Sequence, residues 1–80
     1  MTVRVVFLGK LADVAGETSR ELAGPIDWSG LLDALGPELA EAALGKRTRV
    51  AVDGALLADK TELLADDGSE VALLPPVSGG

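Results

Sequence analysis

The chain begins with alternating apolar positions. Residues 2–8 are rich in β-branched and apolar residues, and Gly9 follows them, a pattern typical of a strand that ends at a turn. Side chains alternate between the two faces of a strand, so we expect Val3, Val5 and Phe7 to point into the core. Residues 10–15 favour a short turn of helix. Residues 17–22 then predict a second strand, which forms a hairpin with the first through a wide connection.

An apolar stripe at helical spacing follows the hairpin. Its members are Trp28, Leu31, Leu32, Leu35 and Leu39. This spacing predicts an amphipathic helix with Asp27 or Ser29 as its N-cap. Gly36-Pro37 interrupts the pattern, because proline disfavours helical geometry in the preceding residue but suits the first position of a new helix. A second short helix is therefore expected over residues 37–44, ending at Gly45.

The last third of the chain again favours strands. Residues 48–52 place Val50 and Val52 on one face, and Asp53-Gly54 is a strong signal for a type I′ hairpin turn leading into residues 55–57. A further turn is expected at residues 66–68. The final strand covers residues 70–74, and Pro75-Pro76 ends it because proline cannot donate to a ladder.

This order of elements predicts an α+β fold of the β-grasp (ubiquitin-like) type. In this arrangement a mixed sheet has its first and last strands side by side and parallel, with one main helix packed across them. We divide the chain into a β-grasp domain at residues 1–74 and an extended tail at residues 75–80. Eighty residues leave no room for a second core.

The composition excludes most kinds of catalytic site. The chain has no Cys and no His, which excludes disulfides, thiolate nucleophiles, histidine triads and the common zinc motifs. No metal site and no permanently bound cofactor are expected, and none of the hydroxyl residues has a plausible base beside it in sequence. The chain is therefore predicted not to be an enzyme on its own.

Charge limits the partners. Thirteen acidic and seven basic residues give a net charge of −6, so nucleic acids and anionic membranes would repel the chain, and a basic protein partner suits it better. Lys46, Arg47 and Arg49 lie close together, and we interpret them as a solvated start of a strand in preference to a phosphate site. No apolar run is long enough to span a membrane, and a cytoplasmic protein is expected.

The outward face of the sheet is a candidate docking surface. If Val3, Val5 and Phe7 point inward, Leu8 and Leu74 end the outward rows of the two parallel strands, together with Val6. These residues would form an exposed apolar patch beside the tail, which Leu56 is expected to join. The alternative is a set of scattered surface leucines, which are normal in soluble proteins.

The tail suggests a different kind of chemistry. Pro75 and Pro76 stiffen its root, Val77 and Ser78 extend it, and the last two residues carry no side chain. A tip of Gly79 and Gly80 can thread a narrow channel and bring its carboxylate to another protein. That carboxylate would need activation as a mixed anhydride with AMP before a sulfur or amine nucleophile could attack it. The alternative is an ordinary frayed terminus.

The ending EVALLPPVSGG, preceded by ADDGS, closely resembles the small subunit of molybdopterin synthase, the MoaD family of ubiquitin-like sulfur carriers. The resemblance extends over the whole chain, including the VVFLGKLADVAG opening and the VAVDG hairpin. The family often has Arg at Ala12, Asn at Asp53 and aromatic residues at Leu8 and Leu74. These differences affect partner affinity and not the chemistry at Gly80.

The resemblance implies a role and partners. An ATP-dependent adenylyltransferase of the ubiquitin-activating type would adenylate Gly80, and sulfur transfer would give a thiocarboxylate. Gly79 would let the tip pass, with residues 75–78 as spacer. The tail would enter the large subunit of molybdopterin synthase, in a heterotetramer, and donate sulfur to the pterin precursor of the molybdenum cofactor.

Two alternatives remain open. Sulfur carriers of thiamine or cysteine biosynthesis and ubiquitin-like protein modifiers also end in Gly-Gly on a β-grasp domain. From another class, the chain could be a non-catalytic interaction module with an incidental tail.

Overall fold

The structure is a computed structural model that describes residues 2–75. Its elements are β1 (Thr2–Phe7), α1 (Lys10–Ala15), β2 (Ser19–Ala23), β3 (Ile26–Asp27), α2 (Trp28–Leu35), α3 (Pro37–Leu44), β4 (Arg49–Val52), β5 (Ala55–Leu56), the 3-10 helix η1 (Lys60–Glu62), β6 (Leu64–Ala65) and β7 (Glu70–Leu74). Across residues 2–75, no helix has the length and apolar character needed to cross a membrane.

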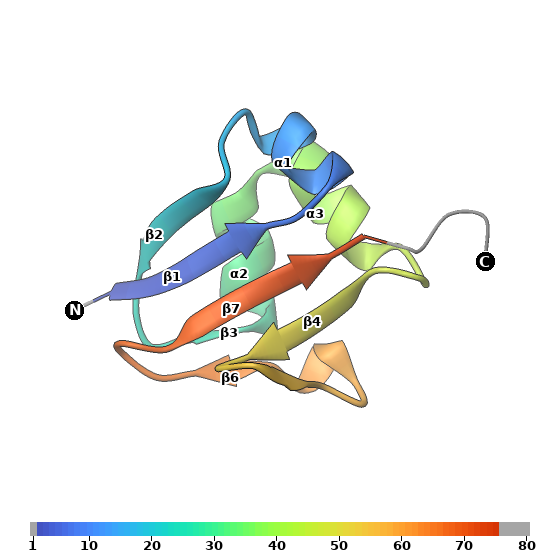
Figure 1. The fold of residues 1–80 in the computed structure, drawn as a ribbon. Helices are drawn as coiled ribbons and strands as arrows, with labels where there is room; N and C mark the ends of the chain where they lie inside the picture. The colour runs from blue at the N-terminus through green and yellow to red at the C-terminus, as the bar shows by residue number, and fades with distance from the viewer. Residues whose placement is uncertain (1, 76–80) are drawn as a thin grey trace.

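A five-stranded mixed sheet organises the molecule (Figure 1). Its strand order is β2-β1-β7-β4-β5, and β3 pairs with β6 in a separate two-stranded sheet. The first and last strands are parallel, with Val5 opposite Val71, whereas β4 runs antiparallel to β7. The β-grasp prediction is confirmed, and β7 lies in the centre of the sheet.

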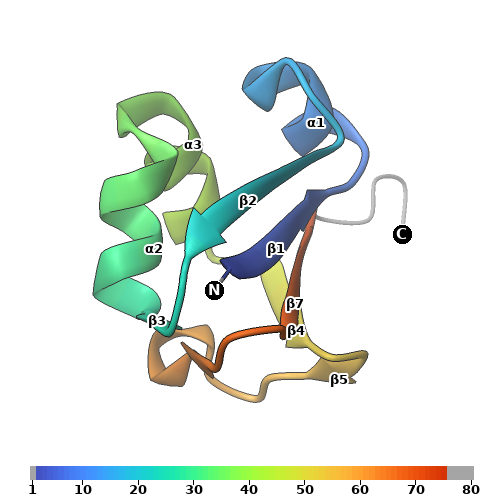
Figure 2. The same ribbon diagram turned by 90° about the vertical axis from the view of Figure 1, so that its left-hand side faces the viewer.

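The helices cover one face of this sheet (Figure 2). Side chains alternate along β1, where Val3, Val5 and Phe7 are buried as predicted. From the helical layer, Leu31 and Leu35 of α2 pack into the same core. The other buried apolar side chains of this core belong to Leu11, Ile26, Leu39, Ala43, Val50, Leu63, Ala65, Val71 and Leu73. Among residues 2–75, no helix covers the opposite face of the sheet.

The expected local signals set the helix ends. Asp27 caps α2, because its Oδ1 accepts a hydrogen bond of 2.8 Å from the Gly30 N–H. Ser29 lies within the helix, so the alternative cap is wrong. Gly36, with a φ of 85°, separates α2 from α3, which begins at Pro37 as predicted.

The strand boundaries differ from the prediction in detail. Strand β1 ends at Phe7, because the chain turns at Gly9 and leaves Leu8 outside the regular ladder. Strand β2 begins at Ser19, because the connection from α1 runs on to Thr18. Strand β4 begins at Arg49, since Thr48 belongs to the turn before it.

The β3–β6 pair was not anticipated. Ile26 lies opposite Ala65, and both are buried. Two-residue strands carry no alternating pattern long enough to be recognised, so the sequence gives no local sign of this contact.

Candidate functional site

The candidate residues Leu8, Leu74 and Pro75 lie at one end of the strands of the sheet. We call this end of the sheet the tail edge. Strands β1 and β7 are parallel and both end there, and β4, antiparallel to β7, begins there. Figure 1 shows the chain leaving β7 at this edge, beside the loop that joins α3 to β4. Groups from three distant parts of the sequence are thus brought around the root of the tail.

Strand register aligns a row of apolar residues on the open face. Val6 lies opposite Ala72, Ala72 opposite Ala51, and Ala51 opposite Leu56. Leu8 and Leu74 follow this row toward the tail edge. We call these six residues, Val6, Leu8, Ala51, Leu56, Ala72 and Leu74, the outer patch. The structure therefore brings Leu8, Leu56 and Leu74 to one face, as expected, and their role in docking stays a prediction.

Exposure differs within the outer patch. Leu8 is 41% exposed and Leu56 is 58% exposed, whereas Leu74 and Val6 are half-buried. Leu57, the neighbour of Leu56, packs against the core instead. Ala51, between Leu56 and the half-buried Ala72, is buried. The large exposed side chains of the outer patch are thus Leu8 and Leu56, and an exposed apolar patch of this kind can mark a protein-binding site.

Gly9 lies against the root of the tail. The Leu11 N–H donates to the Leu8 carbonyl at 3.1 Å, and Gly9 has φ 54° and ψ −129° within this tight turn. A Cβ on Gly9 would lie 3.0 Å from Cγ of Pro75. The sequence marks Gly9 only as the end of a strand, because its contact with Pro75 depends on the pairing of β1 with β7.

The remainder of the candidate tail lies outside the described residues. Of the residues assigned to it from the sequence, Pro75 is described, half-buried, directly after β7. The others are Pro76, Val77, Ser78, Gly79 and Gly80. Their assigned roles as spacer, passage and sulfur-bearing group therefore stay predictions.

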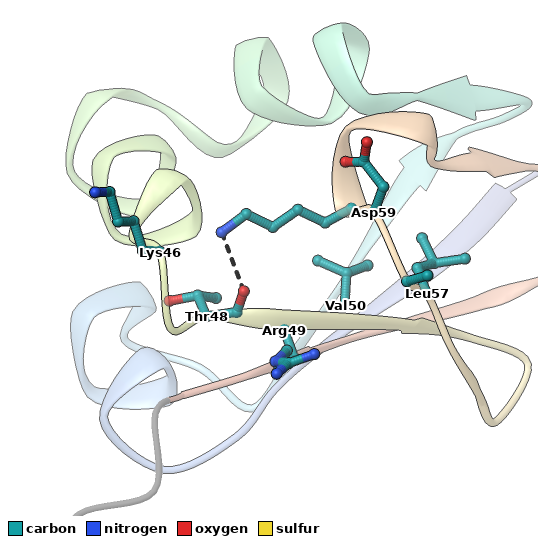
Figure 3. A pocket seen from close by; sticks show the side chains of 8 residues that line it. Lys46, Thr48, Arg49, Val50, Leu57 and Asp59 are labelled. Carbon is teal, nitrogen blue, oxygen red and sulfur yellow. Dashed lines mark hydrogen bonds between the residues drawn. The ribbon is translucent and has the colours of Figure 1, made fainter.

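A shallow pocket of about 190 Å³ lies beside the tail edge (Figure 3). It is lined by Lys46, Thr48, Arg49, Val50, Leu57, Ala58, Asp59 and Lys60. In Figure 3, Val50 and Arg49 point to opposite sides of β4, as expected for neighbours in a strand. The pocket thus lies between residues 45–48, which we call the basic loop, and the segment before η1.

Lys60 holds the basic loop in place. Its Nζ donates to the carbonyl of Thr48 at 3.0 Å, drawn as the dashed line in Figure 3, and to the carbonyl of Gly45. The buried Thr48 adds a 2.8 Å hydrogen bond from its hydroxyl to the carbonyl of Ala42. Residues 45–48 are therefore fixed to α3 on one side and to η1 on the other.

Two ionisable groups of this pocket, Asp59 and Lys60, make hydrogen bonds that hold the local structure. Partial burial, with a smaller effect of Arg49, lowers the pKa of Lys60. Hydrogen bonds from the hydroxyl and N–H of Thr61 lower the pKa of Asp59. Within residues 2–75, no group of three His, Cys, Asp or Glu side chains could hold a metal ion. The pocket offers neither a metal site nor a nucleophile beside a base.

A family model described as the ThiS family matches residues 5–80. The chain belongs to the ThiS family. It is a ubiquitin-like carrier of the ThiS/MoaD type. The family model extends over nearly the whole chain, so the resemblance first seen in the tail is confirmed at the level of the family. No curated protein gives a match.

Solved structures share the ThiS-family fold. SAMP1 from Haloferax volcanii is 28% identical with a TM-score of 0.73, and the match covers 100% of each chain. A chain of the complex of subunits 1 and 2 of molybdopterin-converting factor from Helicobacter pylori 26695 is 25% identical with a TM-score of 0.68, again over 100% of each. The Amycolatopsis orientalis BexX/CysO complex contains a chain that is 23% identical with a TM-score of 0.74, over 98% of this chain and 99% of that one, and supports the fold alone.

Proposed function

We propose that this chain carries sulfur for molybdenum cofactor biosynthesis, as the small subunit of a molybdopterin synthase. The observation that carries the proposal is the sequence PPVSGG placed directly after the central strand β7, on a domain of the ThiS family. The six residues 75–80 would reach roughly 18–20 Å from the sheet if extended. That length suits a tail which enters the catalytic site of another protein.

The chemistry would proceed in two steps at Gly80. An ATP-dependent adenylyltransferase of the ubiquitin-activating type joins the carboxylate to AMP and releases pyrophosphate. A sulfur nucleophile then attacks the acyl carbon, AMP leaves, and a thiocarboxylate remains. The catalytic groups belong to the partners, in keeping with a chain that has no Cys and no His.

The outer patch supports a protein partner. Its exposed leucines lie on a face that no helix of residues 2–75 covers, with Leu8 after the end of β1 and Leu56 two strands away from β7, in β5. A large subunit seated on this patch would receive the tail without any change in the domain. The Helicobacter pylori neighbour was solved as a complex of subunits 1 and 2, which supports a two-subunit synthase here; a heterotetramer with one carrier at each end of a central dimer is the expected form. Such an assembly would act in the cytoplasm.

Mass spectrometry tests the proposal. The purified chain is incubated with ATP, sulfide and the adenylyltransferase of the same organism. We expect its mass to rise by the difference between sulfur and oxygen, and the product to convert pterin precursor into molybdopterin when the large subunit is added. An unchanged mass would favour an interaction module with an incidental tail.

A second candidate is protein modification or another sulfur pathway. The similarity to SAMP1, named in related structures as a small archaeal modifier protein, supports a modifier. CysO, at 23% identity, shares the fold alone. Isopeptide-linked conjugates of the tagged chain in cells, without molybdopterin formation by the thiocarboxylate form, would decide for the modifier.

A further inference from the structure

Four basic residues lie next to the strand ends that flank the root of the tail, in a chain with a net charge of −6. Lys10 follows β1 on one side of β7, and Lys46, Arg47 and Arg49 lie at the start of β4 on the other side. All four are exposed, and they are four of the seven basic residues of a chain with a net charge of −6. We call these four residues the basic rim.

The far edge of the sheet has the opposite sign. The turns that end β4 and begin β7 carry exposed carboxylates, and these belong to Asp53, Asp66, Asp67 and Glu70. The parallel pairing of β1 with β7 and the antiparallel pairing of β4 place these turns at the end opposite the tail edge. The basic rim and these carboxylates therefore lie at opposite ends of β7, with Arg4 as the cation opposite Glu70 at the far end.

Within the described part of the chain, the cations of the rim form no ion pair. Among residues 2–75 the structure records one ion pair, between Arg20 and Glu17. Asp59, the carboxylate that lines the neighbouring pocket, accepts hydrogen bonds from Thr61 instead. Pairing with a carboxylate of residues 2–75 therefore does not account for these cations.

The loop carrying two of these cations is also held rigidly. Lys60 fixes the carbonyls of Gly45 and Thr48, and the Thr48 hydroxyl is bonded to α3. The backbone of Lys46 and Arg47 therefore lies between two anchored residues. An anchored backbone loses less conformational entropy on binding than a loose loop does.

We infer that the basic rim docks on an acidic protein surface around the channel of the adenylating enzyme that receives the tail. This inference rests on the proposed function. The adenylating enzyme is the first partner to meet the free carboxylate, and long-range charge acts mainly on diffusional encounter. A negative entrance would attract the rim and turn the tail edge, not the acidic far edge, toward the channel.

The experiment compares two variants of equal net charge. Lys46→Gln/Arg47→Gln removes two rim charges, and the control Ser29→Glu/Ala34→Glu adds two carboxylates on the exposed side of α2, so both variants move the net charge from −6 to −8. The association rate of each full-length chain with the adenylating enzyme is measured by stopped flow at about 50 mM and about 500 mM salt, where screening differs strongly.

For the rim variant we expect association about 10-fold slower than wild type at low salt and within about 2-fold at high salt, with an unchanged maximal rate of adenylation. The α2 control should stay within about 2-fold of wild type at both salt concentrations, and unfolding curves should show that both variants are folded.

Other outcomes overturn the inference in distinguishable ways. Equal association rates for the rim variant, the control and wild type would refute the docking role of the basic rim and leave the proposed function intact. If the rim variant slowed binding to the synthase large subunit and not to the adenylating enzyme, the rim would be a docking surface for the large subunit instead. If wild-type chain is not adenylated at all, the proposed function fails, and the inference fails with it.

Discussion

Asp53 lies in the turn between β4 and β5 and is hydrogen-bonded to the start of β7. It adopts a left-handed conformation, with φ at 50°, which is uncommon for a residue other than glycine. Its Oδ1 accepts a hydrogen bond of 2.9 Å from the Glu70 N–H, and its Oδ2 accepts one of 3.1 Å from the Ser69 hydroxyl. Its own N–H donates to the Glu70 carbonyl at 2.8 Å. One residue thus closes a hairpin and fixes the strand from which the tail extends.

Three substitutions separate the two effects. Asp53→Ala loses both side-chain hydrogen bonds, worth about 1 kcal/mol net at this exposed site, and tolerates the left-handed conformation less well, at a further cost of about 1 kcal/mol. Asp53→Gly loses the hydrogen bonds but relieves the backbone, so about 1 kcal/mol is expected. Asp53→Asn keeps an acceptor and suits the conformation, so it should stay within about 0.5 kcal/mol of wild type.

Thermal and urea unfolding followed by circular dichroism measures these differences. A loss of about 2 kcal/mol corresponds to a fall of roughly 10 °C in Tm for a domain of this size. Asp66→Ala, which removes a carboxylate at the same edge of the sheet, is the control and should change stability by less than about 0.5 kcal/mol. If the glycine variant is as unstable as the alanine variant, the conformational part of the reasoning is wrong. If the asparagine variant is equally unstable, the hydrogen-bond part is wrong.

Three further results are expected. Leu57→Ser should destabilise the domain by about 1–2 kcal/mol because Leu57 packs against the core. Leu56→Ser, at a 58% exposed position, should leave the unfolding curve unchanged and weaken binding of the large subunit in calorimetry. The reverse pattern would contradict the assignment of Leu56 to the outer patch. Gly79→Ala should fold normally yet lose thiocarboxylate formation by mass spectrometry, and full modification of that variant would show that the tip tolerates a Cβ. Hydrogen bonds from Thr61 lower the pKa of Asp59 below its ordinary value of 3.8, so the unfolded chain binds more protons just below that pH and stability should fall as the pH is lowered through the folded-state pKa. The Asp59→Asn variant should lack this part of the pH dependence in acid titrations followed by circular dichroism, and an identical acid transition in both proteins would argue against it.

The sequence predicts the elements that depend on local pattern. The alternation in β1, the capped stripe of α2 and the Asp53-Gly54 turn each follow from neighbours in the chain, and all are found. The parallel placement of β1 and β7 was also accessible, because the order of elements restricts how the strands can pair. The alternation of side chains along β1 and β7 then indicates which residues face the core and which face outward.

Contacts between distant segments could not be predicted in the same way. Ile26 meets Ala65 through two-residue strands, and Gly9 meets Pro75 only because two strands end side by side. The basic loop looked like a solvated start of a strand, and its position beside the tail depends on the direction of β4. In each case the decisive information is the three-dimensional neighbour, which no window of sequence contains.

The central position of β7 has a consequence for synthesis of the protein. β7 pairs with β1 on one side and β4 on the other. A nascent chain that stops before residue 70 therefore leaves each of these two strands with an unpaired edge. It also lacks the apolar side chains of β7 that belong to the core. Such chains cannot complete the core and are exposed to proteolysis. Folding of the domain therefore depends on β7, the strand that directly precedes residues 75–80.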